Sequence, residues 1–163
     1  MAVLIGRGRH ATDIVNDMNH HAIVSFPHHT KWDGEGGPVY IGVNDPKERA
    51  RIAGELRVED RNWIHKRAYV GHGCTFGHGV HVNYGASMIR TSLGNHVTVS
   101  PGATISGGVS IGHRVLIGAG ATVCDRAWIG DDVTIGAGAV VLHDEFVPAG
   151  ETWVGVPARR LER

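Results

Sequence analysis

A six-residue repeat runs through the second half of the chain and restricts the fold more than any other feature. Large apolar residues recur at every sixth position, namely Leu93, Val99, Ile105, Ile111, Ile117, Val123, Ile129, Ile135, Val141, Val147 and Trp153. Small or β-branched residues stand four positions after most of these anchors, at Val97, Ala103, Val109, Val115, Ala121, Ala127, Val133 and Ala139. An α-helix has about 3.6 residues per turn, so it cannot produce this period.

The repeat predicts a parallel β-helix, in which short strands meet at tight turns and stacked coils share one core. β-branched residues suit the strands, and glycines such as Gly112 and Gly118 suit the turns. The same register continues upstream at Ile64, Val70, Phe76, Val82 and Met88. The interval from Met88 to Leu93 is five residues, so one coil is predicted to lack one residue.

The first 62 residues have the pattern of a smaller β-α-β module. Strands are expected at residues 2–5, 22–26 and 39–42, with a helix at 11–18 between the first two. A second helix is predicted to begin at Pro46, because Asp45 is a good N-cap and proline suits the first helical position. The expected organisation is a module at 1–62, a coil at 63–158 and a tail at 159–163.

Charge and composition argue against several functions. The chain has 16 basic and 16 acidic residues and no basic run, so nucleic acid is not expected as a partner. The apolar run at the amino terminus is too short for a signal peptide or a membrane span, so we expect a cytoplasmic location and no membrane partner. Cys74 and Cys124 lack a CxxC partner and are expected to be reduced thiols.

A glycine-containing turn, Gly6-Arg7-Gly8-Arg9-His10, follows the first expected strand. Glycines between a strand and a helix leave backbone N–H groups available to a phosphate, and the helix end adds partial positive charge. The residues alone leave two interpretations open, a phosphate-binding turn and an ordinary tight turn.

The layout from GRGRH through YIGVNDPKER and WIH to SPGATISGGVSIG and WVGVPARRL resembles the hexapeptide-repeat sugar acetyltransferases. The resemblance is to those of the sialic acid O-acetyltransferase and bacillosamine N-acetyltransferase type. It implies a mainly β fold, a left-handed, three-sided β-helix preceded by a shortened Rossmann-like module. It also implies a homotrimer that uses acetyl-CoA, without a metal, to acetylate an amine or hydroxyl of a sugar or nucleotide-linked amino sugar.

The two histidines of that family are missing at the aligned positions of this chain. If the family's SPG segment is placed on residues 100–102, the second histidine falls on Thr98 and the general base on Arg90. Arginine cannot accept a proton at neutral pH. Because the same histidine spacing occurs one coil earlier, we expect His72 to be the base and His81 to orient the thioester. Arg90 would then hold an anionic group of the acceptor.

The resemblance implies further contacts to both substrates. Gly8 and His10 are expected at the acceptor, and His96 could replace the missing base. The pantetheine arm of acetyl-CoA is expected along one edge of the prism, where small side chains leave room, at Gly107, Ala119 and Ala137.

Two other functions stay open. Arg90 and Thr98 at the aligned positions fit a catalytically inactive scaffold or a sugar-binding protein. The γ-class carbonic anhydrases share this prism and bind a metal through three histidines, and the chain has twelve histidines. The spacing of His72, His78 and His81 matches that metal site poorly. Whether the base is His72, His96 or absent is also left open.

Overall fold

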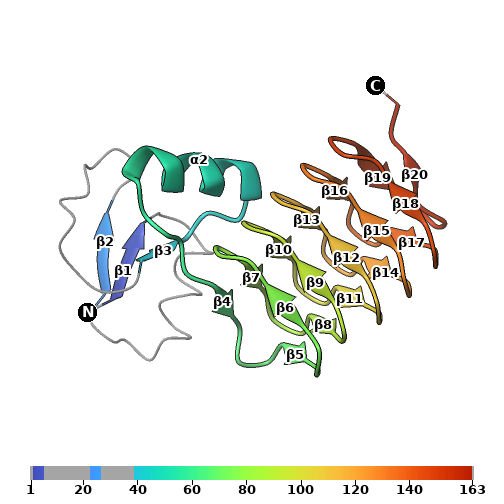
Figure 1. The fold of residues 1–163 in the computed structure, drawn as a ribbon, viewed down its shortest axis with the longest axis horizontal. Helices are drawn as coiled ribbons and strands as arrows, with labels where there is room; N and C mark the ends of the chain where they lie inside the picture. The colour runs from blue at the N-terminus through green and yellow to red at the C-terminus, as the bar shows by residue number, and fades with distance from the viewer. Residues whose placement is uncertain (1, 6–22, 27–38, 163) are drawn as a thin grey trace.

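The structure is a computed structural model that describes residues 2–5, 23–26 and 39–162. The described residues form a small three-stranded sheet, one helix and a long coil of short strands (Figure 1). The helix expected at 11–18, together with Gly8 and His10, lies outside the described residues. None of the helices in the described ranges is long and apolar enough to cross a membrane.

The amino-terminal sheet is parallel, with β1 (Ala2–Ile5) between β2 (Ile23–Phe26) and β3 (Val39–Ile41). All three strands agree with the sequence prediction to within one residue. The helix α2 (Pro46–Leu56) also begins where predicted, because the Asp45 side chain accepts a hydrogen bond from Glu48 N at 2.8 Å. Residues of β3 and α2 share a small apolar core, made of Val39, Ile41, Ile52 and Ala53.

The coil is a three-sided prism with one parallel sheet on each side (Figure 1). Side 1 contains β4 (Trp63–Ile64), β7 (His81–Val82), β10 (Thr98–Val99), β13 (Leu116–Ile117), β16 (Thr134–Ile135) and β19 (Thr152–Val154). Side 2 contains β5 (Tyr69–Val70), β8 (Ser87–Met88), β11 (Thr104–Ile105), β14 (Thr122–Val123) and β17 (Val140–Val141). Side 3 contains β6 (Thr75–Phe76), β9 (Ser92–Leu93), β12 (Ser110–Ile111), β15 (Trp128–Ile129) and β18 (Phe146–Val147).

Three corners connect these sides. Corner 1 leads from side 1 to side 2, corner 2 from side 2 to side 3, and corner 3 from side 3 back to side 1. After the last coil, β20 (Arg159–Arg160) turns back and pairs antiparallel with β19. The residues expected to form a tail therefore extend side 1 by one strand.

The second residue of each strand points into the prism and forms its core. Val99, Ile117 and Ile135 on side 1 are completely buried, and the small corner residues Ala103 and Ala121 are buried with them. These are the positions that the repeat marked as anchors and small residues. The predicted parallel β-helix is confirmed, and its three-sided form is consistent with the left-handed hexapeptide coil.

The predicted short coil is also present. Tyr69 pairs with Ser87, 18 positions later, whereas Thr75 pairs with Ser92, 17 positions later. The missing residue belongs to corner 2, where three residues (89–91) connect β8 to β9 instead of the usual four. The coil absorbs the deletion at this corner, so the strands on both sides of it stay paired.

Candidate functional site

The shortened corner lacks the position that stacks directly on His72. The third residue of the complete corner 2 turns has a positive φ, as at Gly73 and Gly108, and Arg90 takes this role in the short turn with φ 45°. Arg90 N donates to His72 O at 3.0 Å, and Gly108 N donates to Arg90 O at 2.8 Å. The absent residue would therefore have stood between His72 and Gly107.

The side chains around this gap are open to solvent. His72 and Arg90 are both exposed, and Arg90 forms no ion pair with a described residue. The Arg90 guanidinium turns toward the next coil, because a Cβ placed on Gly107 would lie 2.7 Å from Arg90 Nη2. Corner 2 thus presents an imidazole and a guanidinium on neighbouring coils, as the sequence predicts.

Gly107 does not have the open surroundings expected of a pantetheine contact. Its N–H donates to Asp125 Oδ1 at 3.0 Å, and its carbonyl accepts from Arg126 N at 3.0 Å. Arg90 fills the space above it. Both backbone groups are occupied within the protomer, so this expectation does not fit the structure.

Ala119 and Ala137 stack as expected, but on a different edge from Gly107. Gly138 N donates to Ala119 O at 2.9 Å, which places the two alanines on neighbouring coils at corner 1, where both are exposed. Gly107 lies at corner 2. The sequence prediction of a single edge was wrong, because 12 residues span two sides of the prism rather than a whole coil.

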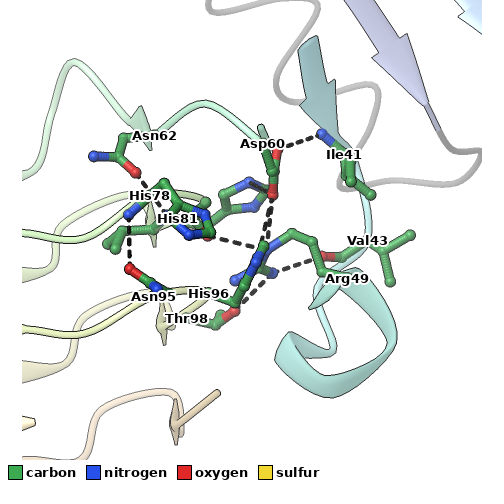
Figure 2. A network of polar contacts seen from close by, with 12 residues as sticks. Ile41, Val43, Arg49, Asp60, Asn62, His78, His81, Asn95, His96 and Thr98 are labelled. Atoms are coloured by element: carbon green, nitrogen blue, oxygen red, sulfur yellow. Dashed lines mark hydrogen bonds and ion pairs between the residues drawn. The ribbon is translucent and has the colours of Figure 1, made fainter. Parts of the chain in front are cut away.

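A buried polar cluster lies where α2 meets side 1 (Figure 2). Arg49, at its centre, is completely buried. Its guanidinium donates to Val43 O at 2.8 Å, to Gly79 O at 3.1 Å and to Thr98 Oγ1 at 2.9 Å. The helix is therefore fixed to the first coils by one side chain whose charge is surrounded by acceptors.

Asp60 supplies the opposite charge in this cluster. Its Oδ1 accepts from Ile41 N at 2.8 Å, and its Oδ2 lies 3.4 Å from Arg49 Nε. Burial lowers the pKa of Arg49 to about 10, although the attraction of Asp60 opposes this shift. Arg49 therefore keeps its positive charge at neutral pH, and the two charges compensate each other inside the protein.

His81 lies inside this cluster, away from any surface that a thioester could reach. Its side chain is completely buried, its Nε2 lies 4.0 Å from Asp60 Oδ2, and its ring meets the Trp63 ring edge-on at 5.9 Å. The side chain points outward from the prism, but the α2 region covers this part of side 1 (Figure 2). The predicted contact of His81 with the thioester does not fit this burial.

His96, the alternative base, belongs to the edge of the same cluster. It is 7% exposed, and its Nδ1 lies 3.8 Å from Asp60 Oδ2. Its ring meets the ring of His78 edge-on, with centroids 4.9 Å apart. At that distance the Asp60 carboxylate does not hydrogen-bond the His96 ring, and His96 offers little surface to an acceptor.

A pocket of about 490 Å³ opens beside the cluster at corner 3, and its walls include Tyr40, Glu59, Arg61, Phe76, His78 and Asn95. His72 belongs to a corner 2 turn and His78 to the corner 3 turn after β6, so the pocket and His72 lie on different corners of the prism. His72, His78 and His81 therefore do not converge. Over the ranges that the structure describes, no three histidine, cysteine or acidic residues gather in a geometry suited to a metal ion.

Sequence reasoning did not identify Arg49 and Asp60 as site residues. A signal for Arg49 was available, since it precedes the buried Ile52 and Ala53 by three and four positions and so shares their face of α2. Asp60 follows a short irregular segment and carries no such periodic signal. Its role depends on a contact with Arg49 that only the fold creates.

Comparison with known proteins identifies the repeat. Residues 90–125 and 108–143 match the family described as bacterial transferase hexapeptide (six repeats). No curated protein matches the sequence. Among solved structures, the acetyltransferase domain of PglB from Neisseria gonorrhoeae FA1090 is 25% identical, with a TM-score of 0.78 and 98% of each chain covered.

Two further solved structures share the fold at lower identity. PerB from Caulobacter crescentus, in complex with CoA and GDP-perosamine, is 23% identical over 99% of this chain and 97% of that chain, with a TM-score of 0.79. WeeI from Acinetobacter baumannii AYE is 17% identical over 99% of both chains, with a TM-score of 0.75. These matches extend over the small sheet and α2 as well as the coil.

Proposed function

We propose that this bacterial transferase hexapeptide-repeat protein is an acetyltransferase that uses acetyl-CoA to acetylate an amine or hydroxyl of a sugar or nucleotide-linked amino sugar. The main support is the likeness to the PglB acetyltransferase domain, which covers 98% of both chains and so includes both parts of the molecule. That domain is also known in complex with acetyl coenzyme A, and PerB with CoA and GDP-perosamine. The same pair of substrate classes is therefore proposed here.

His72 is the proposed general base. Its imidazole is exposed at corner 2, beside the gap left by the missing residue. A neutral imidazole near pH 7 can take the proton of an attacking amine or hydroxyl. In the proposed reaction the acceptor nitrogen or oxygen bonds to the acetyl carbonyl carbon and the carbon–sulfur bond breaks. His72 takes the acceptor proton and returns it to the departing thiolate.

Arg90 is the proposed partner of an anionic group on the acceptor. Its guanidinium lies one coil from His72, and no described carboxylate neutralises it. Arginine suits phosphate and carboxylate groups because its donors form a planar fork. Gly8 and His10 stay proposed acceptor contacts, and they lie outside the described residues.

A homotrimer in the cytoplasm completes the proposal. Trp128 and Phe146 stack on the outer face of side 3 with ring centroids 4.6 Å apart, and they are 44% and 58% exposed. Apolar rings exposed together on a flat sheet support contact with another copy. Light scattering during size-exclusion chromatography tests this state, and a monomeric mass would contradict it.

A non-catalytic sugar-binding protein is the second candidate. It is favoured by the short turn at corner 2, which lacks the position that would stack between His72 and Gly107. No other described histidine occupies that place.

A direct assay separates the two candidates. The protein is incubated with acetyl-CoA and a panel of amino sugars and nucleotide-linked amino sugars, while free thiol and acetylated product are measured. The transferase predicts thiol release that depends on the acceptor and equals the product formed. Sugar binding without CoA binding or thiol release would support the second candidate.

A further inference from the structure

We infer that the pocket at corner 3 is a second binding site, one that takes a neutral sugar ring. It goes beyond the proposed acetyl transfer, because the pocket lies at corner 3 and His72 at corner 2 of the prism. Its volume of about 490 Å³ falls in the range of small-molecule sites.

The pocket walls combine aromatic rings with hydrogen-bonding groups that have no partner among the described residues. Tyr40 and Phe76 are half-buried and supply ring surface. The Tyr40 hydroxyl, the Glu59 carboxylate, the Arg61 guanidinium and the Asn95 amide nitrogen form no hydrogen bond within the described part of the chain. A sugar ring offers apolar C–H faces and hydroxyl groups that both donate and accept, and this wall complements both.

The charges of the wall favour a neutral ligand. Glu59 and Arg61 carry opposite charges on the same segment. The charge of Asp60, between them, is compensated by Arg49 at 3.4 Å. A phosphorylated or carboxylated sugar would therefore meet no excess of positive charge, and a cation no excess of negative charge.

Hydrogen bonds to residues of the coil hold one wall of the pocket, in which Figure 2 labels Asn62, His78 and Asn95. The Asn62 side chain accepts from Val80 N and donates to Gly77 O, both at 2.8 Å. Asn95 Oδ1 accepts from His78 N at 3.2 Å. A Cβ on Gly77 would lie 2.2 Å from Asn95 Oδ1, so the absence of a side chain there lets the amide pack. A preformed wall binds a ligand without the entropy cost of ordering it.

NMR titration of the full chain with methyl α-glucoside and N-acetylglucosamine tests the site. The neutral sugars are expected to shift the ring signals of His78 and Phe76 saturably and to leave His72 unshifted. Glucuronate and glucosamine are expected to bind more weakly. The proposal is overturned if neither neutral sugar shifts these signals, or if the charged sugars bind more tightly.

Variants of the pocket residues test whether the sugar binds at Tyr40 and Arg61. The double variant Tyr40→Phe/Arg61→Gln keeps the aromatic ring and removes the Tyr40 hydroxyl and the Arg61 guanidinium, so sugar affinity should fall about tenfold. Arg67→Gln, at an exposed arginine outside the pocket, is the matched control and should bind like the parent. Unchanged affinity in the double variant would overturn the site.

The acetyl-transfer assay separates this proposal from the proposed function. The double variant should keep the parent's turnover and KM for the acceptor, because the sugar binds away from His72. A raised acceptor KM would identify the pocket as the transferase's own acceptor site and overturn its assignment as a second one. Sugar binding in a protein without transferase activity would leave the pocket assignment intact.

Discussion

Arg49 Nε and Asp60 Oδ2 lie 3.4 Å apart with both side chains completely buried, and this ion pair joins the two parts of the molecule. Arg49 extends from α2 to Thr98 on the coil, while Asp60 accepts a hydrogen bond from Ile41 in β3. Loss of either charge leaves the other buried without compensation. The small sheet, the helix and the first coils should therefore depend on the pair together.

Replacing Arg49 with methionine should lower the free energy of unfolding by about 3–5 kcal/mol, because it leaves the Asp60 carboxylate buried alone. Urea unfolding followed by circular dichroism measures the change. The double variant Arg49→Met/Asp60→Leu should recover part of the loss, since no unpaired charge is left. A single variant as stable as the parent would contradict the structural role of the pair.

Arg51→Met is the matched control on the same helix. Arg51 forms ion pairs with Glu48 and Glu55, but its side chain is 52% exposed. Exposed pairs contribute little because water screens them. The unfolding curve of this variant should overlay that of the parent.

Gly118 lies where the backbones of two successive coils come close to each other. A Cβ on Gly118 would lie 2.5 Å from Ala137 N and 2.6 Å from Gly136 C, both backbone atoms of the next coil. Because backbone cannot turn aside as a side chain does, Gly118→Ala should destabilise the protein by about 1–3 kcal/mol. Thermal unfolding would measure this as a lower Tm.

Gly54→Ala provides the opposite control. Gly54 lies in α2, and a Cβ there would meet no atom within 4 Å. Alanine in a helix is favoured over glycine by about 0.8–1 kcal/mol, so this variant should be slightly more stable than the parent. Equal losses at Gly54 and Gly118 would contradict the packing argument.

Asp132 should contribute stability that depends on pH. Two hydrogen bonds from Arg114, both 2.8 Å long, lower the pKa of Asp132 below its ordinary value. A lowered folded-state pKa means that the contribution is complete above the usual aspartate pKa of about 4 and is lost as pH falls through the folded value. Both side chains are about one-third exposed, so the effect should be below about 1 kcal/mol.

Urea unfolding of Asp132→Asn and of the parent at several pH values measures the contribution of Asp132 to the free energy of unfolding. The variant should be less stable at pH 7, and the two curves should converge in strong acid, where Asp132 is protonated in both states of the parent. Glu162→Gln, at an exposed residue without a described ion-pair partner, controls for the loss of a surface charge. A constant difference at all pH values would show that the ion pair is not its cause.

His72→Ala should lower kcat for acetyl transfer by about 10²- to 10⁴-fold if His72 is the base. The loss should be largest below the pH at which the acceptor amine deprotonates by itself. His143→Ala is the matched control, because His143 occupies the same place in the last coil's corner 2 turn and is exposed. Equal turnover in the two variants would exclude His72 as the base.

The coil could be predicted from the sequence in detail, because its anchors are set by local chemistry repeated many times. Each buried anchor, such as Ile117, occupies the same position in its hexad. The predicted register therefore rests on many residues and does not change if one of them is assigned wrongly. The short turn before Leu93 was also visible as a broken interval. The cap of α2 followed from Asp45 and Pro46 for the same local reason.

The candidate site was less predictable, because its geometry depends on which elements cover which side. By its place in the strand His81 faces outward, and nothing local indicates that Arg49 and α2 lie over it. Gly107 and Ala119 were assigned to one edge although their spacing already placed them on different corners. The buried position of Asp60 depends on contacts across 11 or more residues of chain, which no short motif contains.

The three-residue turn at 89–91 has a consequence for how such proteins diverge. A deletion there removes a surface position, yet the following strands keep their partners and the core keeps its filling. Proteins of this fold can therefore gain or lose a corner residue, and with it a surface side chain, without disturbing the stacked core.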